Sequence, residues 1–207
     1  MEVNDKIMYH FHKNGVYDKT WHRGNTIDVD ESFEGNLLKI TRDFDTNVNG
    51  YSFEKYLRIF LNKEYEKGFI DGIIKNYNKR KEYLELLEIA RCIIWDMNIF
   101  KREMALEEVR KEFFPSLPSR RHSIWVCDDK SIEFWSKRLA PSHITSHKLS
   151  LFEVSLTGKL FKSSENLLPG DNLSYEECID ASFDYWNPHD IDDDKAEYLF
   201  QGKVKVL

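Results

Sequence analysis

Two kinds of hydrophobic periodicity alternate along the 207-residue chain. Residues 7–12 alternate at every second position, which predicts a half-buried strand with His10 and His12 on its more polar side. Residues 197–206 alternate in the same way and predict the last strand, with Glu197 on the side opposite its apolar face. Shorter alternating or β-branched runs predict further strands at 26–29, 122–127 and 149–156.

Between these strands, from about residue 53 to about residue 114, helical spacing dominates. Apolar residues recur there at steps of three and four, so they form one stripe of a helix that is expected to face a core. A dimerising helix pair is the alternative. Pro115 and Pro118 are expected to end this helix, because proline has no backbone N–H to donate. The stripe consists of Tyr83, Leu86, Ala90, Ile93, Met97, Phe100 and Met104.

The mixture of strands and helices predicts an α+β protein with a single domain at 1–207 and a mainly helical insertion at about 53–113. Further helices are expected near 132–139 and 174–186, and an exposed loop at 41–52. Hydrophobic residues make up 41% of the chain and aromatic residues 14%, which is enough to supply a substantial core.

Charge and cysteine content narrow the functional classes. The net charge of −6, with no basic tail, disfavours general electrostatic binding to nucleic acid or to an anionic membrane. Cys92, Cys127 and Cys178 form no Cys-x-x-Cys pair, so neither a disulfide framework nor a cysteine-based zinc site is expected. No run approaches the roughly 18 apolar residues of a membrane span. A cytoplasmic protein is therefore expected.

Three separated segments together resemble the motif strands of the ADP-ribosyltransferase superfamily. Met8–His12 is similar to the Tyr-His pattern on the first strand of its histidine-type members. Residues 114–125, Phe-Pro-Ser-Leu-Pro-Ser-Arg-Arg-His-Ser-Ile-Trp, resemble the Pro-Ser-Arg…Ser-aromatic stretch of bacterial and phage members of unknown target. Residues 196–206 are similar to the closing strand that begins with the catalytic glutamate of the family. The resemblance covers roughly 6–30 and 114–207.

The resemblance implies a split antiparallel sheet with a cleft, in which NAD binds as a substrate. The nicotinamide–ribose bond would be cleaved and ADP-ribose transferred to an unidentified macromolecular acceptor, a protein or a nucleic acid. Such cleavage leaves an oxocarbenium-like sugar, which a nearby carboxylate stabilises. Glu197 is the candidate carboxylate. The resemblance also implies that His10 hydrogen-bonds the nucleotide ribose.

The middle segment supplies further candidate ligands of NAD. Ser123 and Trp125 share one face of the expected strand, where the hydroxyl would support Glu197 or contact ribose. The indole would stack on nicotinamide, with ordinary packing as the alternative. Arg120 is expected to hold the pyrophosphate through its forked N–H groups, and Arg121 satisfies the same pattern.

Two departures from the family pattern leave the acceptor open. Residues 195–197 read Lys-Ala-Glu, so the Glu-x-Glu or Gln-x-Glu pairing that accompanies arginine modification is absent, and the middle strand has no Ser-Thr-Ser triplet. The alternatives are an NAD glycohydrolase on the same fold, a non-catalytic interaction protein using the helical region, and a metal-dependent hydrolase. The last would use His10, His12 and the acidic loop 190–194, but no third ligand stands at matching spacing, and no metal is expected.

Overall fold

The chain folds into two compact units that are not consecutive in sequence. In the computed structural model, residues Met1–Thr41 and Lys101–Leu207 form the first unit, and Arg42–Phe100 form the second. The second unit is thus inserted within the sequence of the first, with both boundaries earlier than the expected 53–113. The structure describes residues 1–14, 20–35, 37–38, 47–48, 51–53, 55, 57–58, 77–140 and 148–207.

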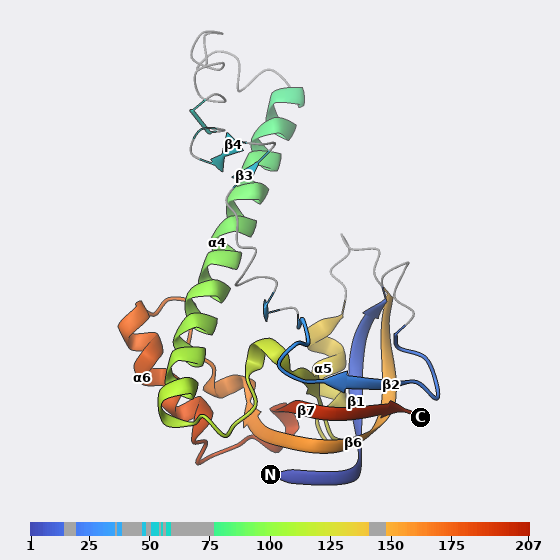
Figure 1. Ribbon diagram of the computed structural model, residues 1–207. Helices are drawn as coiled ribbons and strands as arrows, with labels where there is room; N and C mark the ends of the chain where they lie inside the picture. Colours follow the sequence, from blue (N-terminus) through green and yellow to red (C-terminus); the bar gives the residue numbers. More distant parts are fainter. Residues whose placement is uncertain are drawn as a thin grey trace. The chain divides into compact units, whose positions relative to one another are not determined.

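The first unit is built on a five-stranded antiparallel sheet, so the α+β prediction is confirmed (Figure 1). The strands lie in the order β1-β6-β7-β2, and the short strand β5 also pairs with β7. An isolated bridge between Tyr9 and Cys127 connects the end of β5 to β1. The strands are β1 (Glu2–Asn14), β2 (Thr26–Val29), β5 (Ile124–Val126), β6 (Lys148–Ser164) and β7 (Ala196–Val206).

One prediction about β1 is wrong: the face that carries the histidines is the buried face. Met8 is completely buried in the first core, whereas Ile7, on the face expected to be apolar, is 47% exposed. The reason is register, because Met8 lies opposite the buried Val154 of β6. Pairing with a long neighbouring strand therefore decides which face of β1 is covered.

Two facing glycines allow β6 and β7 to approach closely. Gly158 and Gly202 are partners in the β6–β7 register and have φ of +149° and +140°. A Cβ on Gly202 would lie 2.5 Å from the carbonyl oxygen of Thr157 and 2.8 Å from the Cα of Gly158. Only glycine fits there without displacing the neighbouring backbone.

We therefore expect Gly202→Ala to lower the free energy of unfolding by about 2 kcal/mol, because it adds both a backbone clash and an unfavourable φ. Gly24→Ala is the matched control, since Gly24 also has a positive φ (+86°) but no described atom lies within 4 Å of its Cβ position. The control is expected to lose only about 1 kcal/mol. Denaturant unfolding measures both values, and equal losses would contradict the close-approach argument.

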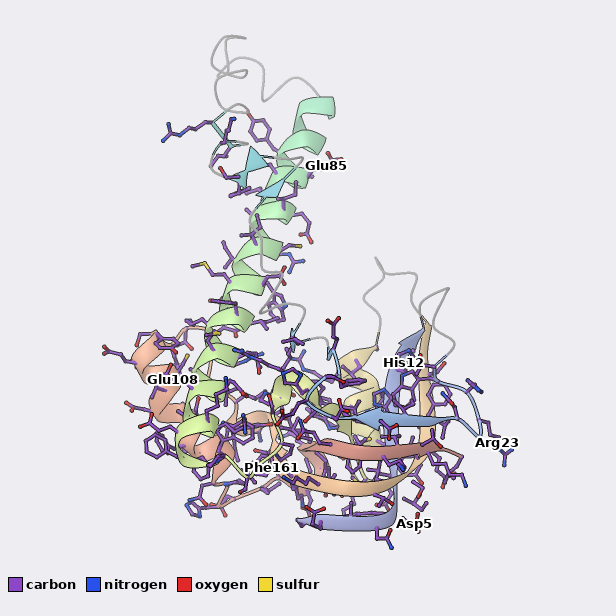
Figure 2. All side chains as sticks on the ribbon, viewed as in Figure 1. Asp5, His12, Arg23, Glu85, Glu108 and Phe161 are labelled. Carbon is purple, nitrogen blue, oxygen red and sulfur yellow. The ribbon has the colours of Figure 1, made fainter. Side chains whose placement is uncertain are left out.

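A second core lies between the sheet and two helices of the first unit. Trp186 of α6 donates its indole N–H to the carbonyl oxygen of Leu106 in α4 at 2.7 Å, which holds α6 beside α4 (Figure 1). Phe161, labelled in Figure 2, contributes to this core from β6. The buried members are Leu106, Val109, Phe161, Tyr185, Trp186 and Leu199. The two helices that border this core are α4 (Tyr77–Phe113) and α6 (Tyr175–Trp186). A further helix, α5, spans Ile132–Leu139.

The predicted bounds of α5 and α6 and the predicted carboxyl-terminal end of α4 are confirmed to within one residue, whereas residues 59–76 of the expected helical stretch lie outside the described residues. Helix α4 stops at Phe113, immediately before the proline-containing turn, and Ser174 caps α6 through a reciprocal hydrogen-bond pair with Glu177. In the predicted loop at 41–52, however, β3 (Asn47–Val48) pairs with β4 (Tyr51–Ser52). No helix in the described part of the chain is long and apolar enough to cross a membrane.

The apolar stripe of α4 is only partly covered. Met97 is 59% exposed, and the other six members of the stripe are partly buried. Complete burial begins beyond the stripe, at Ala105, Leu106 and Val109, where α4 packs on the sheet side of the first unit. The prediction that the whole stripe faces a core is therefore too broad, since among the described residues of α4 the completely buried apolar side chains lie in its carboxyl-terminal part.

Candidate functional site

A buried network of charged and polar side chains joins four distant parts of the chain. Arg120, in the short turn η1 (Arg120–His122), donates through Nε and Nη2 to the carboxylate of Glu103 in α4, at 2.8 and 3.2 Å. Its Nη1 donates to Oε1 of Glu197 in β7 at 2.6 Å. The phenol oxygen of Tyr185 in α6 accepts from Arg120 and donates to Oε1 of Glu197. Each of these four residues is buried, with at most 4% of its surface exposed to solvent.

The charges within this network balance. Nε of Arg102 lies 3.6 Å from Oε1 of Glu103, so two arginines face two carboxylates. Burial raises the pKa of Tyr185 well above its usual range, so this phenol remains neutral and serves as a hydrogen-bond donor. The guanidinium of Arg120 also lies 4.8 Å from the ring centroid of Tyr185 and 5.4 Å from that of Trp125. Arg120 is therefore held by contacts on every side.

The turn that carries Arg120 is anchored to α4 by a second polar cluster. The hydroxyl of Ser119 accepts the backbone N–H of Arg121 at 3.2 Å and donates to Glu107 at 3.0 Å. Arg110 binds the same carboxylate through two nitrogens, at 3.0 and 2.8 Å. Because Ser119 lies directly before Arg120, these contacts set the position from which Arg120 reaches Glu103 and Glu197.

The middle strand brings Trp125 to the side of the sheet on which Glu197 lies. Trp125 pairs with Leu199 of β7 and packs against the second core, and Leu199 lies on the same face of β7 as Glu197. Ser123 does not reach Glu197: its buried hydroxyl donates to the carbonyl oxygen of Ser119 at 2.6 Å. The support that was expected from Ser123 comes from Arg120 and Tyr185 instead.

His10 lies on the first-core side of β5. Its ring stacks on Trp21, with centroids 4.0 Å apart, and its Nδ1 is 2.8 Å from the backbone oxygen of Trp125. A carbonyl oxygen only accepts, so Nδ1 carries the proton and Nε2 is the acceptor nitrogen. Burial lowers the pKa of His10 to about 4, and the imidazole is neutral at pH 7.

The structure thus groups some of the candidate residues and separates others. Arg120, Trp125 and Glu197 lie together, whereas His10 contacts Trp125 only from the opposite side of the strand backbone. No hydrogen bond or ring contact joins the described side chains of His10 and Glu197. The expectation that His10, Ser123 and Glu197 line one cleft is not met in this structure, because β5 lies between them.

The two neighbouring arginines differ in what their guanidinium groups bind. Arg120, expected to hold a pyrophosphate, instead uses three of its nitrogens on Glu103, Glu197 and Tyr185. Arg121 is only partly buried, and its Nη2 lies 2.8 Å from the thioether sulfur of Met104, a weak acceptor. Its buried Nε has no hydrogen-bond partner in the described part of the chain. Of the two, Arg121 retains the greater capacity for an anion.

The sequence did not single out Glu103 or Tyr185 as site residues. One signal was available for Glu103, which stands three residues after Phe100 and therefore lies beside the apolar stripe of the helix. An acid at that position is expected to be buried and to need a cationic partner. Tyr185 carries no comparable signal, because a tyrosine on an amphipathic helix ordinarily packs through its ring.

The acidic loop that was considered as a metal site is paired with lysines. Asp193 binds Lys162 at 2.5 Å and Lys130 at 3.1 Å, and Asp192 binds Lys195 at 2.8 Å. The rings of His10 and His12 lie beside each other and beside Trp21, and Nδ1 of His10 is engaged by the backbone oxygen of Trp125. Over the described residues, no group of three His, Cys, Asp or Glu side chains is placed to hold a metal ion.

The buried position of His10 predicts a pH-dependent stability. Its folded-state pKa of about 4 is below the ordinary 6.5, so between these values the unfolded chain binds a proton that the folded chain does not. The free energy of unfolding is therefore expected to fall by up to about 3 kcal/mol as the pH drops from 6.5 to 4. Denaturant titrations at pH 7, 5.5 and 4.5 measure this fall.

His10→Asn is the control for this prediction. The asparagine amide retains an N–H near the position of Nδ1, which still donates to the Trp125 carbonyl oxygen, but it does not titrate. The difference in stability between wild type and variant should shrink as the pH falls. A difference that stays constant over this range would show that His10 takes up its proton equally in both states.

Comparison with known proteins identifies a family for almost the entire chain. No curated protein matches the chain. One family model, described as a protein of unknown function (DUF2441), matches residues 8–207. The match includes every helix and strand that contributes to the network around Arg120. The chain therefore belongs to the DUF2441 family of proteins of unknown function.

Proposed function

We propose that this protein is a cytoplasmic NAD-dependent ADP-ribosyltransferase that cleaves the nicotinamide–ribose bond, with Glu197 as the catalytic carboxylate. The proposal combines the resemblance of three segments with one observation. That observation is the way Glu197 is held: both hydrogen bonds that it accepts from the described residues end on Oε1. The lone pairs of Oε2 remain for a ligand.

A carboxylate in this arrangement suits glycosyl chemistry. Arg120 and Tyr185 hold Oε1 by donors from two different elements, which fixes the plane of the carboxylate before a substrate arrives. Oε2 would then lie close to the ribose and stabilise the positive charge that develops as neutral nicotinamide leaves. Trp125, on the same side of the sheet, would offer its indole face to the nicotinamide ring.

The remaining parts of the proposal concern access and binding. Glu197 is 4% exposed, so NAD would reach Oε2 through a local opening of the segments that cover it, producing the split-sheet cleft of an ADP-ribosyltransferase. Arg121 would take the pyrophosphate in place of Arg120. His10 would act through the backbone of Trp125, which its Nδ1–H holds in place.

Incubation of the protein with NAD labelled in its adenylate portion, in the presence of a cell lysate, tests this function. Label that becomes bound to a macromolecule supports transfer, and free ADP-ribose without bound label supports the alternative of an NAD glycohydrolase. The Glu197→Gln variant is the matched control for both products. If neither product forms with the wild-type protein and NAD does not bind, the proposal is wrong.

A second candidate function is a non-catalytic interaction protein, and an observation in the second unit favours it. Leu84, Leu87, Ile94 and Trp95 of α4 are 57%, 64%, 60% and 48% exposed. Their spacing places them along one side of the helix, where exposed apolar side chains favour contact with a partner. The mass of the protein in solution, measured against concentration for wild type and Trp95→Glu, tests for self-association through this stripe.

A further inference from the structure

We propose that Tyr185 is a positioning residue for Glu197, which together with Arg120 fixes Oε1 of the carboxylate so that Oε2 is presented to the substrate. This inference rests on the proposed function, and it assigns to Tyr185 a role that the three resembling segments do not contain. The two donors converge on one oxygen from α6 and from η1, so neither element alone determines where the carboxylate lies.

Tyr185 is itself held at both its side chain and its main chain. Its ring is completely buried and packs edge-on against Trp186, with centroids 4.9 Å apart. Its backbone oxygen accepts a hydrogen bond from the hydroxyl of Ser163 at 3.0 Å. Ser163 is the partner of Glu197 in the β6–β7 register. The main chain of Tyr185 is therefore tied to the strand that lies directly beside Glu197, and its phenol is tied to the carboxylate.

The charged composition of the network indicates that it serves to position Glu197 and not merely to stabilise the fold. Removing charged groups from water is costly, and a set of apolar side chains of similar volume fills an interior at least as stably. Arg120 receives its counterbalancing charge from Glu103 through two hydrogen bonds, at 2.8 and 3.2 Å. One carboxylate thus anchors the arginine, and the arginine and the phenol together orient the other carboxylate.

The chain offers a closely matched pair of variants to test this role. Tyr185→Phe removes the phenol that donates to Glu197, and Tyr175→Phe removes a phenol of the same helix that donates to Glu108 at 2.5 Å. Both changes delete one hydroxyl that binds a glutamate, but the second carboxylate lies on the exposed side of α4. The three readouts are kcat for NAD cleavage, KM for NAD and the circular dichroism spectrum.

We expect Tyr185→Phe to lower kcat by about 10-fold with KM for NAD changed by less than about 2-fold, because a misplaced carboxylate weakens only the transition-state interaction. A change that merely loosened the fold would alter the circular dichroism spectrum and KM as well as kcat. Tyr175→Phe should match wild type in all three readouts.

Each outcome distinguishes the inference from the function on which it rests. If the wild-type protein cleaves NAD and Glu197→Gln does not, but Tyr185→Phe equals wild type, positioning by Tyr185 is overturned and the proposed function stands. If the wild-type protein does not cleave NAD, both are overturned. If Tyr185→Phe fails to fold, Glu103→Gln takes its place. That variant loosens the anchor of Arg120, and an unchanged kcat in it overturns the inference.

Discussion

Replacing Glu197 with glutamine is expected to lower the rate of NAD cleavage by about 1000-fold, because an uncharged amide no longer stabilises the oxocarbenium-like sugar. The protein is expected to remain folded, because Arg120 keeps its two hydrogen bonds to Glu103 and the amide oxygen still accepts from Arg120 and Tyr185. Nicotinamide release from NAD, followed by chromatography, measures the rate in each variant.

Glu197→Asp is the companion variant, since it keeps the charge but withdraws the carboxylate by one methylene. An intermediate rate is expected, because catalysis by a carboxylate falls off over short distances. The NAD affinity of both variants, measured by calorimetry, separates loss of binding from loss of cleavage. Wild-type turnover in Glu197→Gln would remove this residue from the mechanism altogether.

Replacing Arg120 with methionine is expected to lower the free energy of unfolding by about 4 kcal/mol, because it leaves the buried Glu197 without its cation and Glu103 with only its longer contact to Arg102. Methionine has a similar length and fills much of the same volume, so lost packing contributes little. Urea unfolding at pH 7 measures the change. Arg121→Met is the matched control and should lose about 1 kcal/mol or less, because the described structure gives Arg121 no carboxylate partner within salt-bridge distance.

The double variant Arg120→Met with Glu103→Gln tests the cause of this loss. Removing one of the two carboxylates together with the arginine is expected to restore part of the stability, because one uncompensated charge disappears. An additive loss in the double variant would instead attribute the effect to packing. A loss below about 1 kcal/mol in Arg120→Met alone would show that the network is open to water.

The elements that the sequence located correctly are those in which a local pattern and the tertiary environment agree. The alternation at 197–206 identified β7 and the side on which Glu197 lies, and the two prolines marked the end of α4. The helix expected near 174–186 is α6, which begins within one residue of that range. Side-chain periodicity and proline act over a few residues, so their consequences are the same in most folds.

Errors arose where a distant partner decided the outcome. The buried face of β1 followed from its register with β6, which a single strand does not encode. The close pairing of Gly158 with Gly202 joins residues 44 positions apart and left no local signal. For the same reason the role of Arg120 changed from an expected phosphate ligand to the centre of a buried network.

The amino-acid sequence by itself determined the α+β class of the chain and its main strands and helices, because these depend on residue type and short-range spacing, and it singled out Glu197 as the candidate carboxylate. Only the tertiary structure decided that Glu103, Arg120, Tyr185 and Glu197 share one buried network and that His10 lies across β5 from it. The physical reason is that buried charges need partners from whichever segments are adjacent in space. Strand register and helix packing, which involve residues far apart in sequence, determine which segments are adjacent.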